Sequence, residues 1–318
     1  MIIRLISSIC AESIHRKEAI IARLRPFAII SSMRERTPFP GELLRELPNL
    51  RLLLATGTQF ETFDTAAARA LGIAVAAAPG RGRTDGRRAS HVPPRPRLDI
   101  RRGGSHPTTQ HAWALILALA RNVAADDAAM KGPGKRWQTG LAVGLTGATL
   151  GVVGLGRLGA AVARIGALAF GMRVVCWSEN LTQEKADAAA EELFRSADVV
   201  SLHYVLSERS RGTVGRRELE LMKRSALLVN TSRGPLVDQE ALYHALRRGG
   251  IRGAALDVFD IEPLPEDSPW RSTEWGSKLL LTPHMGYVEE GIMHTWYEET
   301  AENVERWLQG QDVLHRLN

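Results

Sequence analysis

The sequence predicts an α/β fold, with a Rossmann-type doubly wound parallel sheet in one domain and a second, smaller α/β domain. Two observations predict it. Short apolar runs alternate with stretches of helical spacing, and a G-x-G-x-x-G pattern directly follows one of the apolar runs. Unbroken apolar strands that alternate with helices are typical of a parallel sheet covered on both faces. A chain of 318 residues is long enough to bury the cores of two domains.

The larger domain is expected to contain six strands, each a short apolar run. They are predicted at residues 149–154, 172–177, 197–203, 225–230, 252–259 and 278–283. Residues 157–170 carry apolar side chains at helical spacing, which predicts a helix. Residues 238–250 begin with acidic side chains and end in glycine, which predicts a second helix.

The smaller domain is predicted from three briefer repeats of the same pattern, at residues 27–33, 50–57 and 72–78. Residues 107–130 read as one long, mostly apolar helix that links the two domains, and residues 291–311 read as an amphipathic helix that returns to the smaller domain. The expected domains are therefore residues 1–106, residues 107–286, and a C-terminal return at residues 287–318.

Charge and cysteine content exclude several classes of protein. Eight of the 41 Lys and Arg residues and two of the 35 Asp and Glu residues lie between Arg81 and His106, so the rest of the chain carries 33 of each. The net charge of +6 therefore belongs to one segment and predicts no basic face for nucleic acid. The two cysteines, Cys10 and Cys176, predict no disulfide framework, and no apolar run is long enough for a membrane span. A cytoplasmic protein without a metal site is expected.

The glycine pattern predicts a dinucleotide site. Gly154, Gly156 and Gly159 follow a predicted strand and open a predicted helix, with Arg157 and Leu158 inside the pattern. The alternative is an ordinary glycine-rich turn without a ligand. Because the pattern lies between a predicted strand and a predicted helix, the pyrophosphate-binding interpretation is favoured. An acidic residue that binds the adenosine ribose is expected at the end of the next strand, where this chain has Ser178. NAD and NADP therefore both stay open as cofactors, with NAD slightly favoured.

Three polar side chains are expected beyond the carboxyl ends of strands. They are Arg233 in "NTSRG", Glu262 in "DIEPLP" and His284 in "TPHMG". Singly they could be a helix cap, a solvated acid and a structural histidine. Together, an arginine fork suits a planar carboxylate, an imidazole suits proton transfer to a 2-oxo oxygen, and a carboxylate bonded to that imidazole would orient it.

These motifs resemble the D-isomer-specific 2-hydroxyacid dehydrogenase family. The similar segments are "TLGVVGLGRLG", "LFRSADVVSLHYVLSERSRG", "ELMKRSALLVNTSRGPLVD", "GAALDVFDIEPLP" and "LLLTPHMGY", in the family's order across about residues 137–310. The resemblance implies a flavodoxin-like smaller domain, a homodimer formed through the nucleotide domains, and a small 2-oxo or 2-hydroxy acid as substrate.

The resemblance also implies roles for further residues. Thr56, Gly57 and Thr58 would line the pocket for the substrate carboxylate. Cofactor contacts are implied for His203, Thr231, Asp257, His284 and Gly286. For His203, a strand-end histidine bonded to backbone is an equal alternative.

The sequence departs from the family at Ser178, at a shortened N-terminus and within residues 81–106. That stretch holds eight arginines, Pro93, Pro94 and Pro96 but no aromatic residue, and it falls in a loop that is normally short. It is expected to be a mobile, solvated excursion. It could be a nucleic-acid-binding arm, a gating loop, or translated non-coding sequence, and the last interpretation is favoured. Beyond it, Gln110 stands where the family usually has Glu.

The sequence therefore predicts an NAD(P)-dependent oxidoreductase that interconverts a 2-oxo acid and a D-2-hydroxy acid. Arg233 would bind the substrate carboxylate, His284 would transfer the proton and Glu262 would tune His284. The alternative is a catalytically weak or inactive sensor that binds NAD(H), similar to the corepressors that resemble this family. No membrane or nucleic-acid partner is expected.

Overall fold

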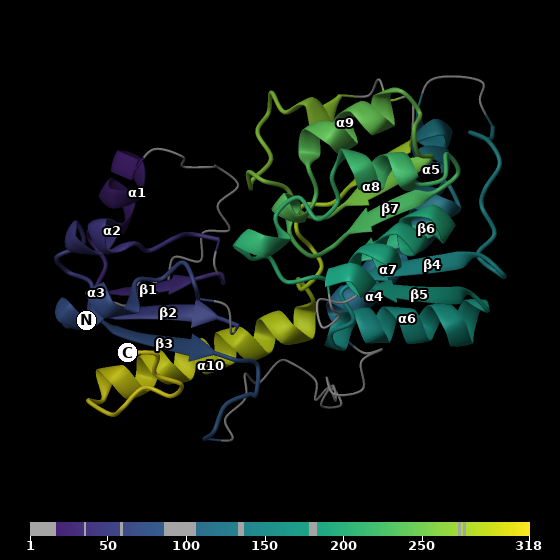
Figure 1. Cartoon of the computed structure of the whole chain (residues 1–318). Helices are drawn as coiled ribbons and strands as arrows, with labels where there is room; N and C mark the ends of the chain where they lie inside the picture. The colour runs from purple at the N-terminus through teal and green to yellow at the C-terminus, as the bar shows by residue number, and fades with distance from the viewer. Residues whose placement is uncertain are drawn as a thin grey trace. The chain divides into compact units, whose positions relative to one another are not determined.

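The computed structural model describes residues 17–34, 36–57, 60–85, 106–132, 137–177, 183–272, 275 and 278–318. The chain divides into two compact units (Figure 1). Unit 1 comprises Met1–Arg95 and Glu290–Asn318, and unit 2 comprises Pro96–Glu289.

Unit 2 is built on a six-stranded sheet in which every strand pair is parallel. The strands are β4 (Thr149–Val153), β5 (Arg173–Trp177), β6 (Val199–Leu202), β7 (Leu227–Asn230), β8 (Gly253–Leu256) and β9 (Lys278–Leu281). Their order across the sheet is β5-β4-β6-β7-β8-β9. The parallel sheet and all six strands predicted from the apolar runs are thus confirmed.

Helices cover both faces of this sheet (Figure 1). On one face, α4 (Pro107–Ala120) and α6 (Arg157–Phe170) bury an apolar cluster that includes Trp113, Ile116 and Val162. On the other face, α7 (Gln183–Ser196), α8 (Arg216–Leu221) and α9 (Gln239–Arg247) bury a cluster that includes Leu193, Leu219 and Leu246. Two covered faces explain why strands such as β4 and β6 are buried at every position instead of at alternate positions.

Unit 1 is a smaller α/β unit with a three-stranded parallel sheet. Its strands, in the order β1-β2-β3, are β1 (Ile29–Ser32), β2 (Leu52–Thr56) and β3 (Ala74–Ala78). Its helices are α1 (Lys17–Leu24), α2 (Gly41–Arg45), α3 (Thr65–Ala70) and the C-terminal α10 (Glu290–Leu308). Helix α10 packs on β2 and β3, where Val304 joins Leu52, Leu54 and Ala76 in one apolar cluster.

The expected single helix over residues 107–130 is wrong, because the structure has two helices there. Helix α4 ends at Ala120, and α5 (Val123–Lys131) follows after Asn122, which adopts the left-handed conformation with φ 60°. The Asn122 side chain donates to the backbone oxygen of Gly140 and accepts from Lys278. These tertiary contacts stabilise a backbone conformation that asparagine tolerates better than most residues. The helix therefore ends here, although the apolar periodicity of the sequence predicts that it continues.

The described start of the arginine-rich stretch, residues 81–85, is bound to α10. The Glu299 carboxylate accepts hydrogen bonds from the backbone N–H groups of Gly80, Arg81 and Gly82. Glu302 accepts from both the backbone and the hydroxyl of Thr84, and Arg83 pairs with Glu305 and Asp85 at 2.6 Å each. The Arg83 side chain is only 9% exposed, whereas Arg81, Thr84 and Asp85 are exposed, so this start faces solvent while it is hydrogen-bonded to α10. Residues 86–105 lie outside the described residues.

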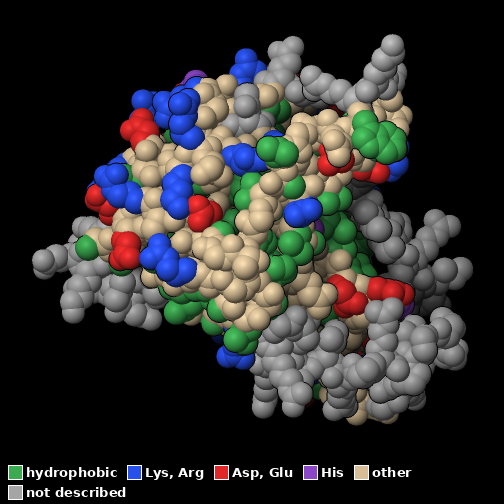
Figure 2. All heavy atoms as spheres, turned by 90° about the vertical axis from the view of Figure 1, so that its right-hand side faces the viewer, with side chains coloured by type: hydrophobic (Ala, Val, Ile, Leu, Met, Phe, Trp, Pro, Cys, Tyr) green, Lys and Arg blue, Asp and Glu red, His purple; other side chains and the backbone are tan. Residues whose placement is uncertain are grey.

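Charge is mixed on the described surface of the face shown in Figure 2. Lys and Arg side chains lie among Asp and Glu side chains and do not gather into one basic surface there. Within the described ranges, no helix has both the length and the apolar content needed to cross a membrane.

Candidate active site at the carboxyl ends of the strands

The topology brings the three predicted catalytic side chains to one edge of the larger sheet. Arg233 follows β7, Glu262 follows β8 and His284 follows β9, and these three strands are adjacent in the sheet. Since the strands are parallel, all three loops leave at the same edge.

Glu262 and His284 form a short, direct hydrogen bond. The His284 Nδ1 atom lies 2.5 Å from Glu262 Oε2, and the two side chains are 17% and 28% exposed. The other carboxylate oxygen of Glu262 accepts the backbone N–H of Phe259 at 2.9 Å. The His284 ring also packs edge-on against Tyr287, at 5.3 Å between ring centroids. Both partners of the pair are therefore held from a second side, which fixes the orientation of the imidazole.

Arg233 is held in a tight loop after β7. Asn230 organises this loop, because its side chain donates to the Arg233 carbonyl at 2.8 Å and accepts the Ser232 N–H at 3.0 Å. The next residue, Gly234, packs so closely on the β8 loop that a Cβ atom would stand 2.1 Å from the carbonyl carbon of Phe259. The glycine of the "NTSRG" motif is thus required for the loops of Arg233 and Glu262 to pack together.

The three glycines after β4 serve different purposes. Gly154 has φ 95°, and Gly159 approaches the Gly154 carbonyl so closely that a Cβ atom would lie 2.0 Å from its oxygen. A Cβ atom on Gly156 would meet nothing within 4 Å. Two of the glycines are therefore needed by the fold itself, while Gly156 borders open space at the N-terminus of α6.

This open space has the features of a pyrophosphate site. Gly156 is the N-cap of α6 and makes no side-chain cap, so the first N–H groups of a 14-residue helix are available at its positive end. The loop leaves β4 beside β6, where the strand order reverses, and such reversal points bind ligands in open α/β sheets. Arg157 is exposed and Leu158 is half-buried in the first turn. The residues present thus fit a dinucleotide, and the expected ribose contact, Ser178, lies outside the described residues.

Three further predicted cofactor contacts, His203, Thr231 and Asp257, follow β6, β7 and β8. His203 Nε2 lies 2.9 Å from Ser201 Oγ, and its Nδ1 is enclosed without a partner among the described residues. Burial lowers the pKa of His203 to about 4, so its ring is neutral at neutral pH. The Thr231 hydroxyl is also buried and makes no hydrogen bond within the described part of the chain. Such orphaned polar atoms are consistent with a polar ligand at this edge.

Asp257 is fully buried and binds the loop that carries His284. Its Oδ1 accepts the N–H of Met285 at 2.7 Å, and its Oδ2 accepts the N–H of Gly286, another predicted cofactor contact, at 2.8 Å. Burial raises the pKa of Asp257, but hydrogen bonds from His111, Thr282 and Met285 outweigh it and lower the pKa below its ordinary value. Asp257 is therefore ionised at neutral pH.

The predicted substrate-pocket residues belong to unit 1. Thr56 ends β2 and is buried, and its hydroxyl accepts the N–H of Arg34 at 3.1 Å. Gly57 has φ 81° and donates to the Ala78 carbonyl at 2.8 Å, while Thr58 lies outside the described residues.

Sequence reasoning missed His111 and Thr282, which both contact Asp257. The available signal for His111 was an imidazole next to the apolar stretch of helix α4 that begins at Ala112. Neighbouring Gln110, where an acid was expected, is exposed.

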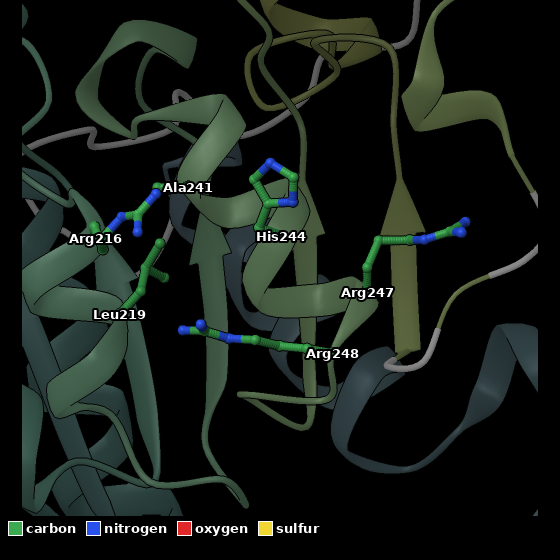
Figure 3. Close-up of a pocket in the computed structure, with 6 residues that line it drawn as sticks. All are labelled: Arg216, Leu219, Ala241, His244, Arg247 and Arg248. Atoms are coloured by element: carbon green, nitrogen blue, oxygen red, sulfur yellow. The ribbon is translucent and has the colours of Figure 1, made fainter.

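A separate pocket lies away from this edge, between α8 and α9 (Figure 3). Its volume is about 510 Å³, and it is lined by Arg216, Leu219, Ala241, His244, Arg247 and Arg248. Arg247 is the last residue of α9 and Arg248 is its C-cap, and the Arg247 side chain points away from the others in Figure 3. No group of acidic, His or Cys side chains suited to a metal ion occurs among the described residues.

Comparison with known proteins identifies one family of dehydrogenases. Residues 113–286 match the family model described as "D-isomer specific 2-hydroxyacid dehydrogenase, NAD binding domain". A glyoxylate reductase of Aeropyrum pernix is 36% identical over 290 residues, which cover 87% of this chain and 79% of that protein. A D-3-phosphoglycerate dehydrogenase of Methanocaldococcus jannaschii is 30% identical over 95% of this chain but only 54% of its own length. A phosphoglycerate oxidoreductase structure from Vibrio cholerae superposes with a TM-score of 0.76 at 32% identity, covering 94% of this chain and 90% of that one.

The glycine environments predict that fold and cofactor binding can be separated by substitution. Gly156→Ala should leave the melting temperature within about 2 °C and weaken NADH binding about tenfold or more, because its methyl group enters the open space that a pyrophosphate needs. Gly159→Ala should instead lower the melting temperature, because its Cβ atom overlaps the Gly154 carbonyl. Thermal melts and NADH fluorescence titrations measure both effects. A Gly156→Ala protein that binds NADH as tightly as wild type would contradict the site.

The buried neutral histidine predicts a pH dependence of stability. Between the ordinary pKa of 6.5 and the value of about 4 for His203, the unfolded state binds a proton that the folded state does not. The free energy of unfolding should therefore fall as the pH falls, by on the order of 3 kcal/mol across this window. Urea denaturation between pH 6.5 and pH 4 should show this loss in wild type and a smaller one in His203→Gln. The exposed His244→Gln variant should follow wild type, and equal losses in all three proteins would refute the assignment.

Proposed function

The chain belongs to the D-isomer specific 2-hydroxyacid dehydrogenase family, and we propose that it reduces a small 2-oxo acid to the D-2-hydroxy acid, or catalyses the reverse oxidation, with NAD(H) as cofactor. The observation that carries the proposal is the 2.5 Å hydrogen bond between His284 Nδ1 and Glu262 Oε2, beside the loop of Arg233.

Each of the three side chains has a distinct part in the proposed reaction. The Arg233 guanidinium binds the substrate carboxylate through paired hydrogen bonds, a geometry that lysine cannot reproduce. Because Nδ1 of His284 is bonded to Glu262, His284 exchanges the proton with the 2-oxo oxygen at Nε2. Glu262 fixes the ring orientation and compensates the positive charge when His284 is protonated. The nicotinamide, when bound, supplies or accepts the hydride.

NAD(H) is proposed over NADP(H) from the sequence after β5. No Lys or Arg occurs between Trp177 and Lys185, so no cation immediately follows the strand to bind a 2′-phosphate. Glu179 adds a negative charge in this segment. The proposed location is the cytoplasm, which is consistent with the two widely separated cysteines.

The test is the rate of NADH and NADPH oxidation with a panel of 2-oxo acids: glyoxylate, hydroxypyruvate, pyruvate and a bulky aromatic member. We expect turnover with at least one acid and a preference for NADH. His284→Ala should lower kcat by about 10²- to 10⁴-fold with NADH binding retained, since general acid-base catalysis contributes about that much. Arg233→Lys should mainly raise KM, since it loses paired carboxylate binding.

The exposed His244→Ala variant on α9 is the matched control and should keep wild-type rates. Full activity in His284→Ala would overturn its role. A wild-type protein that binds NADH but turns over no acid in the panel would favour the sensor function.

We further propose that the chain forms a homodimer through unit 2. Four large apolar side chains are exposed on α5 or in the ten residues that follow it: Val123 at 56%, Met130 at 55%, Trp137 at 74% and Leu141 at 88%. Exposed apolar side chains concentrated in one short region are typical of a protein interface, and a second copy is the partner that the family resemblance implies.

The oligomeric state tests this interface. Wild type should elute as a dimer in size-exclusion chromatography with light scattering, and the double variant Trp137→Asp with Leu141→Asp should elute as a monomer. Val205→Asp, at a side chain that is 77% exposed elsewhere in unit 2, should stay dimeric. A wild-type monomer, or a dimer that survives the double substitution, would refute this interface.

A further inference from the structure

Three consecutive backbone N–H groups in the turn that carries His284 donate to one residue, Asp257. The N–H groups of His284, Met285 and Gly286 donate to the Asp257 carbonyl at 2.8 Å, to Oδ1 at 2.7 Å and to Oδ2 at 2.8 Å. Three consecutive backbone donors thus end on a single buried aspartate. The backbone of the turn at residues 284–286, from which the His284 ring extends to Glu262, is therefore positioned by Asp257.

This dependence matters because the His284 backbone is strained. Its φ is 54°, in the left-handed region that only a few per cent of non-glycine residues adopt, with Asn, Asp and His the most frequent among them. Such a conformation persists only when surrounding contacts hold it. If the carboxylate of Asp257 could rotate, the N–H groups of Met285 and Gly286 would lose their acceptors and the turn could relax.

His111 on α4 is the side chain that limits this rotation from the helical layer. Its Nε2 lies 3.1 Å from Asp257 Oδ1 and 3.2 Å from Thr282 Oγ1. The hydroxyl proton of Thr282 is directed at Asp257 Oδ1, 2.6 Å away. Nε2 of His111 therefore faces a carboxylate oxygen, which can only accept, and a hydroxyl oxygen whose proton is already donated, so Nε2 carries a proton and donates. The His111 side chain is only 20% exposed, which makes this hydrogen bond to a carboxylate stronger than a surface contact.

We propose that His111 is a positioning residue for His284: its Nε2–H fixes the Asp257 carboxylate, and that carboxylate holds the turn at residues 284–286. The proposal rests on the proposed function for its kinetic readout. It extends the site from the strand ends to helix α4.

Two substitutions separate hydrogen bonding from packing at this position. His111→Leu removes the donor and keeps a good helix former, whereas His111→Gln keeps an N–H donor at similar reach. We expect His111→Leu to lower kcat by about tenfold to a hundredfold, the effect of leaving a buried charged acceptor without one partner, with KM changed less than about threefold. His111→Gln should restore kcat to within about fivefold of wild type. His244→Leu, at an exposed histidine on α9, should match wild type.

A second readout does not need turnover. In side-chain NMR spectra, the His284 ring resonances should move in His111→Leu, and they should stay in place in His244→Leu. If wild type reduces no 2-oxo acid, the proposed function fails, and this readout still tests the positioning. Unchanged kcat and His284 resonances in His111→Leu would overturn the proposal. Equal kcat losses in His111→Leu and His111→Gln would also overturn it, because packing would then explain the effect.

Discussion

The common direction of the strands in unit 2 is the constraint on which the site depends. All six strands are parallel, so every loop that follows a strand leaves at the same edge of the sheet. Residues that are more than 100 positions apart in the sequence, such as Gly156 and His284, therefore lie at the same edge of the sheet because of the strand direction alone. The buried strands fix this edge, and the polar side chains of the site lie in the loops that follow the strands.

Close packing of loop backbones then brings neighbouring strand ends into one site. Gly234 lies against the carbonyl of Phe259, and Phe259 in turn donates its N–H to Glu262. The loop that carries the arginine and the loop that carries the acid are thus coupled through a contact that has no room for a side chain. The motif glycine next to Arg233 is explained by this packing and needs no direct role in chemistry.

The sequence was sufficient for features that follow from a local pattern. Apolar runs predicted the strands of the larger sheet, because a strand buried on both faces has little freedom in composition. The pairing of Glu262 with His284 was anticipated because both were expected beyond the carboxyl ends of strands in a parallel sheet and because a carboxylate suits an imidazole partner. The helix break at Asn122 was missed because its left-handed backbone is stabilised by Gly140 and Lys278, which are distant in sequence. His111 was missed for the same reason. Its partner Asp257 lies about 150 positions away, and the hydrophobic periodicity of the sequence does not predict such a contact.

The binding of residues 80–85 to helix α10 has a consequence for proteolysis. Arginine-specific proteases must draw the guanidinium of the cleaved residue into a deep acidic pocket. The Arg83 guanidinium already pairs with Asp85 and Glu305, and the preceding peptide N–H groups are bound by Glu299. A protease would have to strip this segment from the helix before it could cleave after Arg83. Arg83 is therefore a poor cleavage site despite its position in an arginine-rich sequence, and its resistance would report on whether α10 is folded.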